Sequence, residues 1–181
     1  MFRAIIALGL LAAGASTTAA DTRLTTDASA CMTGPVGQFG RYVGEWEIED
    51  EQLQQDGVSW LPGTADRWDF YCVGDGLAVQ DFWRPEGGSL GTNLRTWNPD
   101  NDRWEIVWTA TQTPGVTLIS ATQKDDGSIV MLQESPIPTP LRRITFYPPD
   151  ERGWRWVLEF STDDGATWFE VYRIKATPAA G

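Results

Sequence analysis

Residues 91–110 read GTNLRTWNPDNDRWEIVWTA, and this stretch decides the fold class. In its second half Trp104, Ile106 and Trp108 are separated by single residues, which is the period-two pattern of a strand with one apolar face. The Asn98–Asn101 segment, Asn-Pro-Asp-Asn, carries residue types that favour tight turns. Two strand-like runs joined by such a turn predict an antiparallel β-hairpin.

The same pattern of short strand-like runs and turns extends along most of the chain. Most connections between the runs have about two to six residues, whereas a parallel crossover needs a dozen or more. The sequence therefore predicts an all-β, antiparallel fold, either a sandwich or an up-and-down barrel that leaves no exposed edge. Ten runs are predicted, at residues 42–52, 64–73, 77–84, 90–97, 103–111, 116–123, 128–134, 140–147, 153–161 and 166–176.

The N-terminus has the three-part pattern of a secretory signal peptide. Arg3 precedes an apolar run at 5–15, and small residues follow as far as Ala20. The run is shorter than the roughly 20 residues that span a bilayer, and no later segment has that length. We expect residues 1–20 to be cleaved and the protein to be exported, either periplasmic or secreted; the alternative is an uncleaved anchor.

Length and charge limit the organisation and the partners of the mature protein. Cleavage would leave 161 residues, which suits one domain with its own core. We expect an N-terminal arm at 21–38, a barrel at 39–177 and a short tail at 178–181. The mature chain would hold 13 basic and 25 acidic residues, a net charge of −12. Nucleic acids and anionic lipid surfaces are therefore poor partners, since both attract positive proteins.

The chain has two cysteines, Cys31 and Cys72, and no histidine. An even cysteine count in an exported protein predicts one disulfide, which would close a loop of about 40 residues and contribute about 4 kcal/mol. Without histidine the chain lacks the usual general base, the usual haem ligand and a serine–histidine pair. Two cysteines alone do not complete a four-ligand zinc site. We therefore expect neither a metal nor a cofactor.

Three features resemble the calycins, the superfamily of lipocalins, fatty-acid-binding proteins and nitrobindin-like barrels. Gly44-Glu45-Trp46 opens the first predicted strand as the Gly-x-Trp element does in calycins, and the 91–108 hairpin resembles their mid-chain hairpin. The third feature is a basic residue in the last strand, Arg173 or Lys175, which the resemblance places over Trp46. The resemblance covers residues 39–177 and is nearest to exported bacterial lipocalin-like families without an established function. It implies a ten-stranded barrel. It does not imply the histidine-ligated haem of nitrobindin-like barrels, because this chain has no histidine.

A second motif occurs near the C-terminus. Residues 161–168, Ser-Thr-Asp-Asp-Gly-Ala-Thr-Trp, match the Asp-box of sialidase-like propellers. Those propellers carry several copies in a much longer chain, and this chain has one. We interpret the motif as a well-made hairpin between the last two strands.

The functional prediction is a binding barrel. The ten tryptophans could fill the core or line an interior pocket for a small apolar or aromatic ligand. We expect Arg95 to be the polar anchor for a ligand carboxylate, with Asp69 or Glu105 as its partner in the empty protein. The candidate ligand-binding residues are Tyr71, Arg95, Glu105, Arg143 and Tyr172, and the candidate structural residues are Trp46, Arg173, Cys31 and Cys72.

Two other functions stay open at this point. The first is a barrel enzyme without metal, a cyclase or decarboxylase that uses Tyr71, Arg95 and Glu105 for acid–base chemistry. The second is a carbohydrate or envelope-interaction module with exposed tryptophans. The exposure of the tryptophans distinguishes the binding barrel from the carbohydrate module. A ligand-binding barrel buries the rings, whereas a sugar-binding face exposes them in a row. The sequence leaves open the ligand and the oligomeric state.

Overall fold

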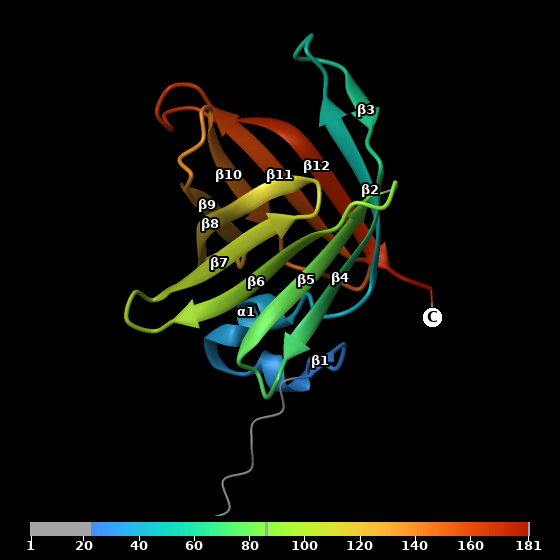
Figure 1. The fold of residues 1–181 in the computed structure, drawn as a ribbon, viewed down its shortest axis with the longest axis vertical. Coiled ribbons are helices and arrows are strands. Elements are labelled where there is room, and N and C mark those ends of the chain that lie inside the picture. Colours follow the sequence, from blue (N-terminus) through green and yellow to red (C-terminus); the bar gives the residue numbers. More distant parts are fainter. Residues whose placement is uncertain (1–22, 86, 181) are drawn as a thin grey trace, which may run out of the picture.

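The structure, a computed structural model, describes residues 23–85 and 87–180. It is all-β, with ten antiparallel strands closed into a barrel, two additional short strands and very little helix (Figure 1). The predicted fold class is confirmed, and each of the ten predicted runs overlaps one barrel strand. The barrel strands are β2 (Trp46–Leu53), β4 (Ala65–Val73), β5 (Ala78–Pro85), β6 (Gly91–Asn98), β7 (Arg103–Ala110), β8 (Thr113–Gln123), β9 (Ile129–Ser135), β10 (Leu141–Phe146), β11 (Trp154–Ser161) and β12 (Phe169–Pro178).

Strand order explains the closure of the barrel. From β4 to β12 every strand pairs antiparallel with its neighbour in sequence, as the short connections require. The last strand β12 then pairs with β2, and β2 meets β4 at Glu47 and Arg67. This closure leaves none of the ten strands at an open edge. The two additional strands, β1 (Leu24–Thr25) and β3 (Trp60–Pro62), pair with β4 and β2.

The N-terminal arm covers one end of the barrel (Figure 1). It consists of β1, two 3-10 helices at Ser29–Met32 and Gly34–Val36, and the short helix α1 (Gly37–Gly40), so the arm extends two residues beyond the expected end at residue 38. Phe39 of this segment and Tyr42, which follows it, are fully buried in the barrel core. The arm is attached through a disulfide between Cys31 and Cys72 of β4, which confirms the predicted pairing.

The strands alternate between a core face and an outer face. On β12, Ile174 and Ala176 face the core, so that Arg173 and Lys175 lie on the outer face. Arg173 stacks on Trp60 with its guanidinium carbon 4.0 Å from the ring centroid. The expected contact with Trp46 is therefore not formed.

Trp46 lies on the core side of β2 and is half-buried near the arm. Its indole Nε1 donates a hydrogen bond to the Tyr42 carbonyl oxygen over 2.8 Å, and its ring packs edge-on against Trp154. The Gly-x-Trp tryptophan thus joins the arm to the barrel, but its covering residues are aromatic and not basic.

The Asp-box forms the predicted hairpin between β11 and β12. Asp163 accepts hydrogen bonds from Ser161 Oγ and from the backbone N and hydroxyl of Thr167. Gly165 N donates to Ser161 Oγ, and Trp168 Nε1 donates to the Gly165 carbonyl oxygen. These bonds lower the pKa of Asp163 to about 2, the Thr167 hydroxyl having the largest effect.

The predicted signal peptide, residues 1–20, lies outside the described residues. Among the helices that the structure describes, none combines the length and the hydrophobicity needed to cross a membrane.

Candidate functional site

A cavity of about 430 Å³ lies inside the barrel, toward the end opposite the arm. Four tryptophans form much of its wall: Trp68 on β4, Trp83 on β5, Trp108 on β7 and Trp156 on β11. The volume is within the range of small-molecule sites. The other lining residues are Asn93, Arg95, Ala110, Thr113, Thr117, Ile119, Met131, Gln133, Arg142, Ile144, Phe146, Leu158, Tyr172 and Ile174.

Arg95 on β6 is the charged group deepest in the cavity wall. Its side chain is 0 % exposed, and so is that of Asp81 on β5, its one ion-pair partner among the described residues. Arg95 Nη2 forms a close ion pair with Asp81 Oδ2 over 2.5 Å, whereas Nε and Nη1 have no hydrogen-bond acceptor among the residues that the structure describes. Burial lowers the pKa of Arg95, and the charge of Asp81 opposes that effect only in part.

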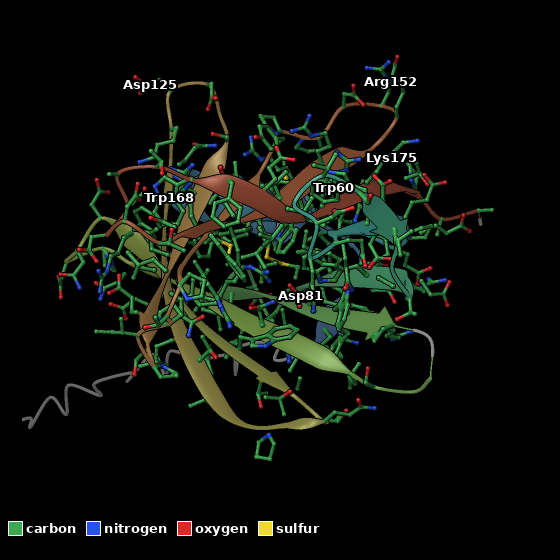
Figure 2. The ribbon with its side chains drawn as sticks, turned by 90° about the horizontal axis from the view of Figure 1, so that it is seen from above. Trp60, Asp81, Asp125, Arg152, Trp168 and Lys175 are labelled. Carbon is green, nitrogen blue, oxygen red and sulfur yellow. A yellow bond between two sulfur atoms is a disulfide. The ribbon has the colours of Figure 1, made fainter. Side chains whose placement is uncertain are left out.

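Asp81 is held in place by Asn93. The backbone N of Asn93 donates to Asp81 Oδ1 over 3.1 Å, and Asn93 Nδ2 donates to both carboxylate oxygens over 3.1 and 3.0 Å. The view from above shows Asp81 within the ring of strands, whereas Asp125, Arg152 and Lys175 lie at the periphery (Figure 2). The three hydrogen bonds from Asn93 satisfy the Asp81 carboxylate, whereas the Arg95 guanidinium beside it keeps donors without an acceptor.

Three phenylalanine rings surround the Arg95 guanidinium. Its central carbon lies 4.8 Å from the ring centroid of Phe39, 5.2 Å from that of Phe70 and 5.7 Å from that of Phe146. The negative ring faces stabilise the buried cation in part. Phe39 belongs to the arm, so the arm contributes directly to the floor of the site.

Two tryptophans add further donors to the cavity wall. Trp68, which is 4 % exposed, and Trp83 each have a buried indole Nε1 without a hydrogen-bond acceptor. Together with Arg95 they make up all of the unpaired buried polar side-chain atoms along the described lining of the cavity. Every one of these atoms is an N–H donor. A bound group that accepts hydrogen bonds would remove the cost of leaving them unpaired.

Tyr172 on β12 is a further polar residue of the cavity wall, and it pairs with Asp50 of β2. Its hydroxyl donates to Asp50 Oδ2 over 2.5 Å, and Asp50 Oδ1 accepts a hydrogen bond from the backbone N of Ala65. Burial raises the pKa of Tyr172 far above its ordinary value, and the hydrogen bond to the Asp50 carboxylate raises it further. Tyr172 therefore keeps its proton, and its donor is already used.

Of the five predicted ligand-binding residues, Arg95 and Tyr172 line the cavity. Tyr71 packs on the outer face against Phe82, with ring centroids 5.7 Å apart. Glu105 accepts a hydrogen bond from Asn98 on the outer face. The structure therefore does not bring Tyr71, Arg95 and Glu105 together, as the enzyme hypothesis required.

Arg143 also lies on the outer face. It forms two hydrogen bonds of 2.8 Å with Glu159 and stacks on Trp168, with its guanidinium carbon 4.4 Å from the ring centroid. Asp69, an expected partner of Arg95, is buried beneath Arg67 and Arg84 on the outer face. The partner of Arg95 is Asp81 instead.

Sequence reasoning missed Asp81, Asp50 and the arm residue Phe39. A signal for Asp81 was present, because it alternates with Val79 and Trp83, which face the core and the cavity. The contribution of Phe39 had no local signal, since it depends on where the arm docks.

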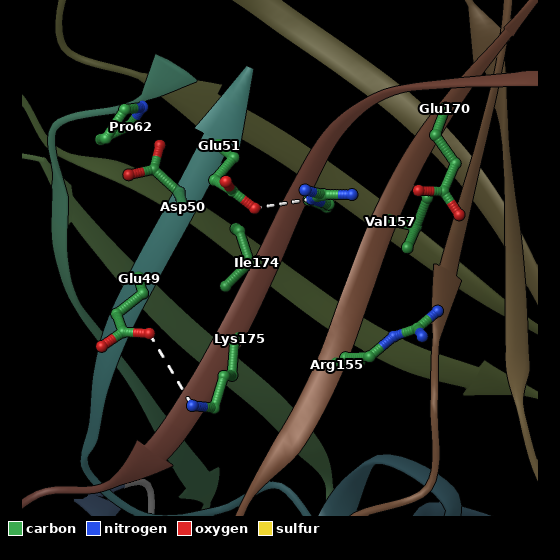
Figure 3. Close-up of a pocket in the computed structure, with 10 residues that line it drawn as sticks. Glu49, Asp50, Glu51, Pro62, Arg155, Val157, Glu170, Ile174 and Lys175 are labelled. Atoms are coloured by element: carbon green, nitrogen blue, oxygen red, sulfur yellow. Dashed lines mark hydrogen bonds and ion pairs between the residues drawn. The ribbon is translucent and has the colours of Figure 1, made fainter. Parts of the chain in front are cut away.

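A separate hollow lies on the outer face of β2, β11 and β12 (Figure 3). Its charges are largely paired across the strands, with Arg173 Nε 2.7 Å from Glu51 Oε2 and Lys175 Nζ 3.8 Å from Glu49 Oε2. Unlike the interior cavity, this hollow has no unpaired buried donor among the described residues that line it. It is therefore the weaker candidate for a ligand site.

The exposure of the tryptophans and the grouping of possible metal ligands bear on which kinds of ligand the protein could bind. All ten tryptophans are described, and each is buried or half-buried, so they form no exposed row for stacking sugar rings. Across residues 23–85 and 87–180, no three cysteine, aspartate or glutamate side chains are grouped so as to hold a metal ion.

In comparisons with known proteins, the chain matches no protein-family model and no curated protein.

Proposed function

We propose that the protein is an exported, calycin-like binding protein that holds a small apolar or aromatic acid inside its barrel. Four observations support this function: the closed barrel, the tryptophan wall, the single arm-covered end and the donor groups at the floor of the cavity. The proposal includes membership of the calycin superfamily, which the closed ten-stranded barrel and the position of Gly44-Glu45-Trp46 at its arm-covered end support.

The observation that carries the proposal is the state of Arg95. A guanidinium has five N–H donors, and here Nε and Nη1 lack a hydrogen-bond acceptor among the described residues although the side chain is fully buried. A ligand carboxylate presents two acceptor oxygens that match the guanidinium fork. Such a ligand would satisfy the donors and add negative charge beside the cation, while its apolar part would contact the tryptophans.

Export is part of the same proposal. The signal pattern at residues 1–20 motivates it, and the disulfide between Cys31 and Cys72 supports it because such bonds persist in oxidising compartments. The mass of the protein recovered from the cell envelope or medium tests this part. A mature chain that begins at Asp21 is expected, and a full-length chain in the cytoplasm would contradict it.

The binding function is tested by titration of purified mature protein with matched pairs of probes. Each pair consists of an acid and its alcohol, dodecanoate with dodecanol and 2-naphthoate with 2-naphthol, and intrinsic tryptophan fluorescence is the readout. We expect at least one acid to change the fluorescence saturably and to bind more tightly than its alcohol. If no probe binds, the ligand function is wrong; if acids and alcohols bind equally, Arg95 is not the anchor.

Native mass spectrometry of protein purified from its own envelope identifies the physiological ligand. A retained small molecule with a carboxyl group is the expected result. A retained neutral or cationic molecule would contradict the proposed anchor.

A further inference from the structure

The cavity has a second polar region, at the end opposite the arm. It is formed by Thr117 of β8, Gln133 of β9 and Arg142 of β10, on three adjacent strands. Gln133 Nε2 donates to the Pro136 carbonyl oxygen over 2.6 Å, which fixes the orientation of that amide. The cavity mouth is therefore polar on this side, as its floor is polar at Arg95.

Arg142 is the charged member of this mouth region. Its guanidinium carbon lies 5.7 Å from the ring centroid of Phe160, and among the described residues no carboxylate pairs with it. Its neighbour Arg143 points to the outer face and is paired with Glu159. Arg142 thus presents a cation to the cavity without a counter-charge from the protein.

Strand geometry places the two arginines at different levels of the cavity. Arg142, Ile144 and Phe146 share the inner face of β10, so Arg142 is four residues, roughly 13 Å, from Phe146 along the strand. The Phe146 ring is in contact with the Arg95 guanidinium. Between these levels the wall of β9, β10 and β11 is apolar, with Met131 and Leu158 directly opposite Ile144.

From this arrangement we infer that the ligand is an elongated molecule with an acidic group at each end and an apolar middle. The inner carboxylate lies on Arg95, the middle lies among the tryptophans, Ile144 and Leu158, and the outer carboxylate lies on Arg142. The inference rests on the proposed function and specifies its ligand class as an α,ω-dicarboxylate. A monocarboxylate would leave an apolar end beside the uncompensated Arg142 cation.

The test compares dodecanedioate with dodecanoate in the mature, disulfide-bonded protein. Kd values are measured by isothermal titration calorimetry for wild type, Arg142→Ala and Arg142→Lys. The matched control is Arg155→Ala, which removes an arginine that stacks on Tyr147 on the outer face and has no carboxylate partner within residues 23–85 and 87–180. Because the Arg142 contact is solvent-exposed, we expect Arg142→Ala to weaken dodecanedioate binding about three- to tenfold and to leave dodecanoate binding unchanged.

Arg142→Lys should recover part of the lost affinity, since it keeps the charge, and Arg155→Ala should affect neither probe. The inference is overturned if Arg142→Ala weakens the binding of both probes equally, or of neither. In that case the binding of dodecanoate by wild type would still leave the proposed function intact. If neither probe binds wild type, although another acid does so, the bipolar class is overturned. If no acid binds at all, the proposed function itself fails.

Discussion

Arg95 and Asp81 face each other inside the barrel, with Nη2 and Oδ2 2.5 Å apart and neither side chain exposed to solvent. The pair joins β5 to β6 and lies above the arm residue Phe39. Asn93 satisfies the carboxylate, and the guanidinium nitrogens Nε and Nη1 lack an acceptor among the described residues. In the proposed function Asp81 is held by the protein, and Arg95 is the group that binds the ligand.

Replacing Asp81 alone should destabilise the protein strongly. Asp81→Asn leaves the buried Arg95 cation without its counter-charge, and we expect the free energy of unfolding to fall by about 3–5 kcal/mol. The double variant Arg95→Met/Asp81→Asn removes both charges and should recover most of the loss, because a neutral pair needs no compensation. Urea denaturation of the three proteins measures both effects. Equal instability of the single and double variants would contradict this account.

The same double variant separates binding from folding. Arg95→Met/Asp81→Asn lacks the donors that we assign to the inner carboxylate, so the acid that binds wild type should bind about tenfold or more weakly. The matched alcohol should bind as it does to wild type, since the tryptophan wall is unchanged. Fluorescence titration with Arg155→Ala as the control measures the difference. Undiminished acid binding by the double variant would exclude Arg95 as the anchor.

Removing the disulfide should loosen the arm. Cys31→Ser/Cys72→Ser opens the loop that the disulfide closes between two residues 41 positions apart in the sequence. We expect the free energy of unfolding to fall by about 2–5 kcal/mol. Since Phe39 belongs to the arm and stacks on Arg95, acid binding should weaken in the same variant. Thermal unfolding and fluorescence titration report the two effects. An unchanged melting temperature would show that the arm docks without the bond.

Asp163 gives the Asp-box hairpin a pH dependence at low pH. The pKa of its carboxyl group is about 2 in the folded protein, whereas the ordinary value is 3.8. Between these pH values the folded state therefore binds fewer protons than the unfolded state. Its contribution to stability is therefore present above about pH 3.8 and is lost as the pH falls through 2. The stability difference between wild type and Asp163→Ala should shrink over this window. A difference that stays constant from pH 5 to pH 2 would contradict the role of these hydrogen bonds.

The sequence by itself determined the strands, their antiparallel order and the disulfide. Strand position depends on local alternation and turn residues, and short connections allow only antiparallel neighbours. The alternation also placed Glu105 opposite Trp104 and Ile106, so its outer position could have been predicted. The two short strands β1 and β3 were missed, because two or three residues carry no periodic signal.

Only the tertiary structure decided which groups meet inside the barrel. Asp81 reaches Arg95 because β5 and β6 pair with Asp81 opposite Asn93 and Val79 opposite Arg95. A shift of this register by one residue would turn the inner residues of one strand outward, and nothing within either strand fixes it. Phe39 reaches the same arginine only because the arm docks on the end of the closed barrel. Strand formation depends on near neighbours in the sequence, whereas the site depends on register and closure, which are properties of the whole barrel.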